Sequence, residues 1–157
     1  ANAPRFMTEQ FFQWFVYIGG SGTILGLCIL LAFMSKSSFG KTLGKAVIIP
    51  SIFNINEPII FGLPIVLNPV LLIPFALVPT INIIISYFCM DLGLVNYTNG
   101  IQLPWTTPPI IAGALLGGWQ GIVIQVINLA MAVAVYLPFV KAQDNAYLKE
   151  EKANKAA

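Results

Sequence analysis

Long apolar runs alternate with short polar ones along the chain. Three runs, residues 11–34, 70–90 and 119–138, contain no charged residue. A helix needs about 20 apolar residues to cross a hydrocarbon core of about 30 Å, and each run meets that length. The pattern therefore predicts an all-α membrane protein, with several transmembrane helices.

Two further apolar stretches, residues 46–67 and 101–116, are interrupted by prolines and polar residues. Irregular backbone is tolerated at membrane depth where it is buried in protein or lines a cavity. We therefore interpret both stretches as broken or re-entrant elements. Within the first, Gly62 is predicted to close a hairpin.

The polar segments set the expected topology. Residues 35–45 carry three lysines and no acid, which predicts a cytoplasmic loop. Residues 141–157 are assigned to the same side, with a helix near 144–152. An even number of crossings must then separate the two segments.

Residues 70–90 and 119–138 already supply two crossings. In the preferred arrangement, residues 46–67 form a hairpin entered from the cytoplasm, and residues 101–116 form a hairpin entered from outside. Residues 91–100 are then an external loop between the span at 70–90 and the second hairpin. The alternative makes both broken stretches full spans, which satisfies the same parity.

Composition supports this class. Of 157 residues, 57% are hydrophobic and 9% charged, against about 25% charged in soluble domains. No basic stripe with interleaved aromatics indicates nucleic-acid binding, and no histidine is present for acid–base chemistry. Cys28 and Cys89 lie in apolar runs without metal-ligand spacing, so we predict packing residues, with no metal and no cofactor.

Three local features predict close packing in a larger bundle. Small residues at 19–22, together with Gly26, offer either a contact face or a kink, and the two are compatible. Prolines recur every five residues from Pro64 to Pro79, which requires neighbouring protein around residues 70–90. Gln125 and Asn128 are predicted to form interhelical hydrogen bonds.

The strongest candidate for chemistry is Glu57. Between residues 46 and 140 it is one of two acidic or basic side chains, with Asp91. An ionisable group at membrane depth is functional by default. Because Pro58 disfavours helical geometry at the residue before it, the backbone at Glu57 is expected to be extended or turned. The alternative is a structural carboxylate that caps backbone amides or pairs with a lysine.

Neighbouring side chains suit a polyhydroxylated ligand. Asn54 and Asn56 add amide donors and acceptors beside Glu57. In the second broken element, Trp105 offers a flat apolar face for a sugar ring, and Thr106 and Thr107 offer hydroxyls. The alternative there is an interfacial tryptophan with helix-capping threonines.

These residues belong to an ordered set of motifs. The run NINEPIIFGLP at 54–64 is preceded by GGSG at 19–22 and followed by PWTTPP at 104–109 and GGW at 117–119. The set resembles the membrane-embedded IIC component of the sugar phosphotransferase system, in its lactose/cellobiose (diacetylchitobiose) branch. The resemblance runs from about residue 12 to about residue 141.

The resemblance implies a multi-pass permease of the bacterial plasma membrane that moves a β-linked disaccharide inward. It implies that a cytoplasmic IIB partner with a phosphocysteine phosphorylates the sugar on arrival. Glu57 would contact the hydroxyl that is phosphorylated and act as its candidate base, while Asn54 and Asn56 would hold the ring. Family members are homodimers with re-entrant hairpins around the sugar.

Two departures bear on the assignment. The family has a sugar-contacting histidine in an earlier hairpin, and this chain has none. The chain resembles the carboxy-terminal third of such a protein. Residues 1–10 are predicted to be a non-native or linker start, 11–140 part of the transport domain, and 141–157 a cytoplasmic tail. Alone, this fragment is not expected to be catalytic.

Two other functions remain as alternatives. An ion-coupled secondary sugar transporter would use Glu57 as a proton or cation site, and it would release free sugar. A membrane interaction fragment would not transport at all.

Overall fold

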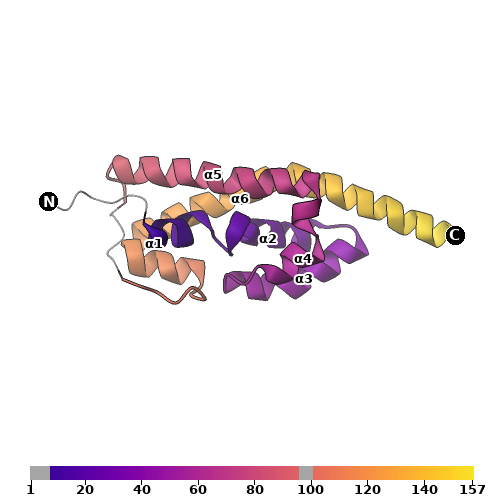
Figure 1. The fold of residues 1–157 in the computed structure, drawn as a ribbon, viewed down its shortest axis with the longest axis horizontal. Helices are drawn as coiled ribbons and strands as arrows, with labels where there is room; N and C mark the ends of the chain where they lie inside the picture. The colour runs from indigo at the N-terminus through magenta and orange to yellow at the C-terminus, as the bar shows by residue number, and fades with distance from the viewer. Residues whose placement is uncertain (1–7, 96–100) are drawn as a thin grey trace.

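The computed structural model describes residues 8–95 and 101–157, and within them every regular element is helical (Figure 1). The predicted fold class, an all-α membrane protein with broken segments, is confirmed. The elements in order are α1 (Glu9–Phe11), η1 (Phe12–Val16), η2 (Ser21–Thr23), α2 (Ile24–Met34), α3 (Ser38–Ile52), α4 (Glu57–Gly62), η3 (Ile65–Leu67), α5 (Pro69–Asp91) and α6 (Pro109–Ala156).

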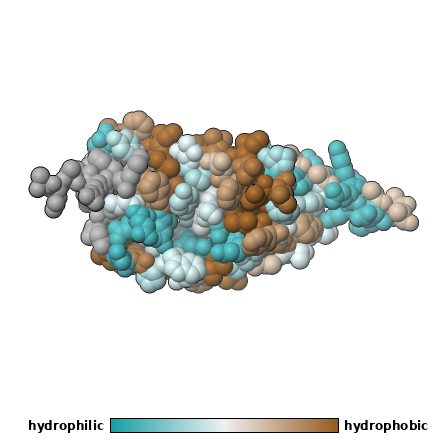
Figure 2. All heavy atoms as spheres, viewed as in Figure 1, coloured by the Kyte–Doolittle hydropathy of each residue, from teal (hydrophilic) through white to brown (hydrophobic). Residues whose placement is uncertain are grey.

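Helices α5 and α6 are long and apolar enough to cross a membrane. The bounds of α5 agree with the predicted span at 70–90. Helix α6 contains the predicted span at 119–138, but it begins before it, breaks at Gly118 and continues as a helix into the predicted tail. Figure 2 shows hydrophilic side chains on the free end of α6, and hydrophobic side chains gathered toward the middle of the molecule. Residues 1–7 of the predicted start and 96–100 of the predicted external loop lie outside the described residues.

The first predicted span is bent rather than straight. Residues 9–23 and 25–34 form a helical pair with an angle of 53° between them. The bend follows a π-helical turn at Phe12–Val16, and the chain then passes through Gly19, Gly20 and Gly22, all with positive φ. The glycine run thus forms the predicted kink. Gly26 in α2 (Ile24–Met34) makes a predicted close contact, because a Cβ there would lie 3.0 Å from Cβ of Ala132 in α6.

Side chains from α5 and α6 stabilise this break by bonding to its free carbonyls. Asn82 donates to the carbonyl of Val16 (3.2 Å), and the predicted interhelical partners Gln125 and Asn128 donate to those of Trp14 (2.9 Å) and Phe15 (2.7 Å). All three amides are buried. Because a broken helix in a membrane must find such partners, these amides explain how the bend is tolerated.

Residues 35–68 form a helical hairpin whose two ends lie at the same end of the molecule. Ser35 and Ser37 donate to Asp144 of α6, and Asn68 donates to its neighbour Gln143 (2.8 Å). Both lysine-bearing segments therefore lie together, as the parity argument requires. The predicted loop at 35–45 is too long, because Ser37 caps α3 through its side chain and Ser38 is already helical.

The second broken element is also a hairpin. Residues 101–108 are not helical, the first turns of α6 follow, and Gly118 (φ 61°) then reverses the chain inside α6. Gly113 and Gly121 lie on either side of this reversal and pack backbone against backbone. The two hairpins thus enter from opposite ends of the molecule, and their tips meet between these ends (Figure 1).

Candidate functional site

Three irregular segments meet at Asn54, in the tip of the first hairpin. Its Oδ1 accepts from the backbone N–H of Gly19 in the bent span (3.1 Å). Its Nδ2 donates to the carbonyls of Trp105 (2.8 Å) and Thr107 (3.0 Å) in the second hairpin. Both amide hydrogens are therefore used within the chain.

Residues 53–56 form the turn at the tip of the first hairpin. The chain reverses at 53–56, not at Gly62 as predicted, and Asn54 adopts φ 62°. Asparagine tolerates this left-handed conformation better than most residues do. Beyond the turn, the buried side chain of Asn56 donates to the hydroxyl (2.6 Å) and the carbonyl (3.3 Å) of Ser21. The bent span and the hairpin are thus joined twice.

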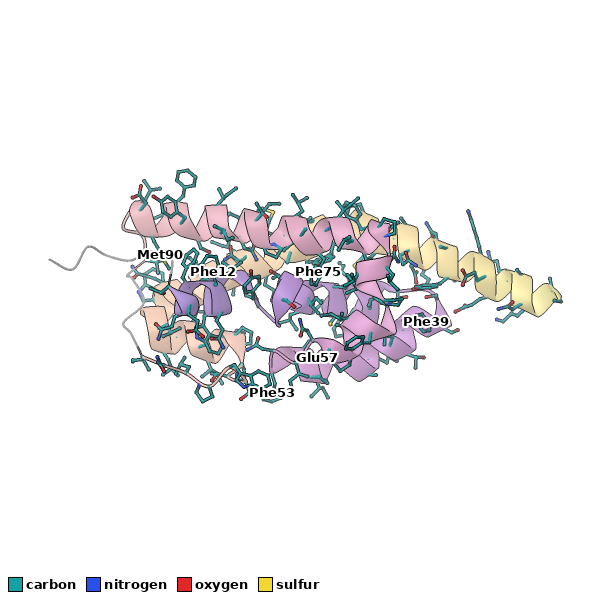
Figure 3. The ribbon with its side chains drawn as sticks, in the orientation of Figure 1. Phe12, Phe39, Phe53, Glu57, Phe75 and Met90 are labelled. Carbon is teal, nitrogen blue, oxygen red and sulfur yellow. The ribbon has the colours of Figure 1, made fainter. Side chains whose placement is uncertain are left out.

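Glu57 is the first residue of α4, so the expectation of an extended backbone there is wrong. Pro58 lies in the first turn of the helix, where its missing N–H costs nothing. The Glu57 side chain is exposed rather than buried. Within the described part of the chain its carboxylate has no hydrogen-bond or ion-pair partner. Figure 3 labels Glu57 at the start of α4.

These segments enclose an open cavity of about 470 Å³. Four of the predicted site residues line it: Asn54, Asn56, Glu57 and Trp105. Its volume falls within the range of about 300–1,000 Å³ that is usual for ligand pockets. The structure therefore brings the core of the predicted site together around one space.

The two threonines are placed differently. Among the described residues, neither Thr106 nor Thr107 lines the cavity. The Thr107 hydroxyl donates to the carbonyl of Pro104 (2.7 Å) and so closes the turn that carries Trp105. Trp105 is 58% exposed and lines the cavity. That the threonines contact a ligand stays a prediction.

Comparison with known proteins now identifies the family. The family model for the phosphotransferase system EIIC component matches residues 1–79, just over half of the chain. The chain belongs to the phosphotransferase system EIIC family. Together with its candidate membrane spans, this makes it a multi-pass bacterial membrane protein.

The curated relatives fall in one branch of the EIIC family. The chain is 47% identical over 150 residues to the lichenan permease IIC component of Bacillus subtilis, covering 94% of this chain and 33% of the relative. It is 46% identical over 156 residues to the cellobiose-specific EIIC component of Geobacillus stearothermophilus, covering 98% and 35%. The chain thus spans about a third of the length of these relatives.

A solved EIIC structure has the same fold. The crystal structure of the transporter ChbC, the IIC component from the N,N'-diacetylchitobiose-specific phosphotransferase system, matches with a TM-score of 0.93 at 44% identity. The match covers 96% of this chain and 35% of ChbC. The lactose/cellobiose branch inferred from the motifs is therefore confirmed, and the specific sugar is not.

The sequence did not identify the part of the EIIC cavity that comes from the bent span. Glu9, Gln13, Tyr17 and Ser21 also line it. The signal that could have found them is the GGSG run, because a break at membrane depth lines a cavity or is covered by protein.

Proposed function

We propose that this chain forms part of the substrate site of a permease that binds a β-linked disaccharide and phosphorylates it during transport. The observation that carries the proposal is that the Glu57 carboxylate, which has no partner among the described residues, lines one cavity with Asn56 and Trp105. Relatives named for cellobiose, lichenan and lactose support the substrate class.

The cavity residues would divide the work. Asn56 uses its Nδ2 on Ser21, so its Oδ1 is available to accept from a sugar hydroxyl. Trp105 would stack on the apolar face of a ring. Asn54 would act mainly as a positioning residue, since its amide hydrogens hold the second hairpin.

Glu57 would act as general base. A hydroxyl of the bound sugar gives its proton to the carboxylate while its oxygen attacks the phosphorus of a phosphocysteine. The sulfur–phosphorus bond breaks, and the thiolate leaves on the partner. This phosphocysteine would belong to a cytoplasmic IIB protein, and the whole permease would be a homodimer. Neither cysteine of this chain would take that role.

The test uses the full-length protein of which this chain is part, in proteoliposomes with phosphorylated IIB protein and cellobiose. We expect Glu57→Gln to lower the rate of sugar phosphorylation at least 100-fold, because a general base contributes about 10²–10⁴-fold. Binding, measured by calorimetry, should fall far less. Asp91→Asn is the matched control, because Asp91 is exposed at the end of α5, outside the cavity lining.

A wild-type rate of sugar phosphorylation in the Glu57→Gln protein would exclude Glu57 as the general base. The ion-coupled alternative predicts free sugar inside the liposomes, with uptake that follows a proton or sodium gradient and needs no IIB protein. Uptake of lactose or N,N'-diacetylchitobiose in preference to cellobiose would revise the sugar and leave the mechanism intact.

A further inference from the structure

A second cavity of about 470 Å³ lies at the end of the molecule where α2 stops and the free part of α6 begins. One part of its lining is apolar and consists of Met34, Leu137 and Val140. The other part is polar and includes Lys36, Lys141 and Asn145. The cavity is separate from the candidate sugar site and shares no lining residue with it.

The charge of this groove is not balanced by its own acid. Asp144 also lines the groove, but it is buried and accepts four hydrogen bonds, from the Ser35 and Ser37 hydroxyls and from the backbone N–H groups of Lys36 and Ser37. Lys36 and Lys141 are exposed, and neither ammonium group has an ion pair within the described residues. The groove therefore presents two exposed cations against one hydrogen-bonded carboxylate, which leaves its lining with a net positive charge.

The order of apolar and cationic side chains follows the membrane boundary. Met34 is the last residue of α2, and Leu137 and Val140 end the uncharged part of α6. Lys36 lies two residues after Met34 and Lys141 directly after Val140, on the side that the lysine-rich loop marks as cytoplasmic. A phospholipid has the same order, with acyl chains in the core and a phosphate at the surface.

We propose that this groove binds an anionic phospholipid of the cytoplasmic leaflet. The phosphate lies between Lys36 and Lys141, and an acyl chain lies along Met34 and Leu137. Basic pockets beside transmembrane helices on the cytoplasmic side are suited to such headgroups. The apolar half of the lining favours a lipid over free phosphate. A bound lipid would join α2 to α6 beside the Asp144 contact.

The test measures lipid retention by native mass spectrometry and thermal unfolding in detergent, on the full-length protein. We expect added phosphatidylglycerol to remain bound and to raise the midpoint of unfolding, because a ligand of the native state stabilises it. Phosphatidylcholine and inorganic phosphate should do neither. The double variant Lys36→Gln/Lys141→Gln should retain at least fivefold less phosphatidylglycerol.

Lys149→Gln/Lys152→Gln is the matched control, because it removes the same charge from α6 outside the groove lining. It should retain lipid like the wild type. Equal retention by both double variants would overturn the proposal, as would no preference of the wild type for phosphatidylglycerol over phosphatidylcholine. If inorganic phosphate raised the midpoint of unfolding as much as phosphatidylglycerol does, the groove would bind a simple anion and the lipid proposal would be wrong. The wild-type comparison stands even if a variant fails to fold.

Discussion

At the scale of single residues, Asn54 does more than its neighbours to define the candidate site. One side chain bonds to the bent span and to two carbonyls of the second hairpin, and its backbone adopts φ 62° at the tip of the first. A net contribution of about 1 kcal/mol per hydrogen bond is usual. Loss of the Asn54 side chain should therefore change the shape of the cavity more than the stability of the protein.

Asn54→Gly tests this role. Glycine keeps the left-handed backbone and loses the three side-chain bonds, so Trp105 and Gly19 should lose their fixed distance from Glu57. We expect affinity for the disaccharide in the full-length protein to fall at least tenfold by calorimetry, about 1.4 kcal/mol.

Asn68→Gly is the control for Asn54→Gly. It loses bonds to Gln143 and to the N–H of Val70, away from the cavity lining, so it should lower stability and keep affinity. Unchanged affinity in Asn54→Gly would show that the three segments hold their positions without this side chain.

At the scale of helices, the sequence predicts the continuous elements better than the broken ones. The predicted 70–90 and the observed Pro69–Asp91 agree because hydropathy alone defines a long span. Glu57 was expected to be non-helical because of Pro58, but proline in a first helical turn is compatible with the helix. The start of α3 was missed because the three lysines led to a loop assignment for residues 35–45, although Ser37 is a helix-capping residue.

The residues of the candidate site likewise fall into those that the sequence could identify and those that it could not. Asn56, Glu57 and Trp105 could be identified because polar groups in apolar runs are conspicuous. Glu9 and Gln13 could not, because their place depends on a bend that brings the start of the chain against the hairpin tip. The hydrogen bonds of Asn54 depend on three distant segments at once, and no local pattern encodes them.

Gly20→Ala tests the bend. A Cβ at Gly20 would lie 2.7 Å from Cγ of Asn56, and the residue has φ 96°. We expect Asn56 to be displaced and sugar affinity to fall at least tenfold in calorimetry. Gly93→Ala is the matched control, because Gly93 also has positive φ (71°) but no atom within 4 Å of a Cβ.

The control Gly93→Ala should lose only about 1–2 kcal/mol of stability from backbone strain. Equal affinities for the Gly20 and Gly93 variants would mean that Asn56 can move without consequence for binding.

At the scale of the whole molecule, the free part of α6 holds the first hairpin in place. Asp144 accepts from Ser35, Ser37 and Lys36, and the Phe39 ring packs on Tyr147 at 4.9 Å. The adjacent Gln143 contacts Asn68 at the other end of the hairpin. Both ends of the hairpin that carries Glu57 are therefore attached to one turn of α6.

This attachment should depend on pH through Asp144. Burial alone would raise the pKa of this carboxyl, but hydrogen bonds from Ser35, Ser37 and the Lys36 N–H outweigh it, and the pKa lies below its usual value. A depressed pKa in the folded state stabilises the protein above the unfolded value of about 3.9, and the stabilisation is lost as pH falls through the folded value. The contribution of Asp144 is thus present at neutral pH and disappears in acid.

Asp144→Asn should therefore lower the free energy of unfolding by about 1–3 kcal/mol at pH 7, since a charged acceptor of several bonds is lost. The measurement is thermal unfolding of the full-length protein in detergent from pH 7 to pH 3. The difference from wild type should begin to shrink near pH 4, where this carboxyl is protonated in the unfolded chain, and should vanish as pH falls through the lower pKa of the folded state. Glu151→Gln, which alters an exposed contact with Phe39, should cost under about 0.5 kcal/mol. A constant difference across the pH range would show that shape rather than charge joins α6 to the hairpin.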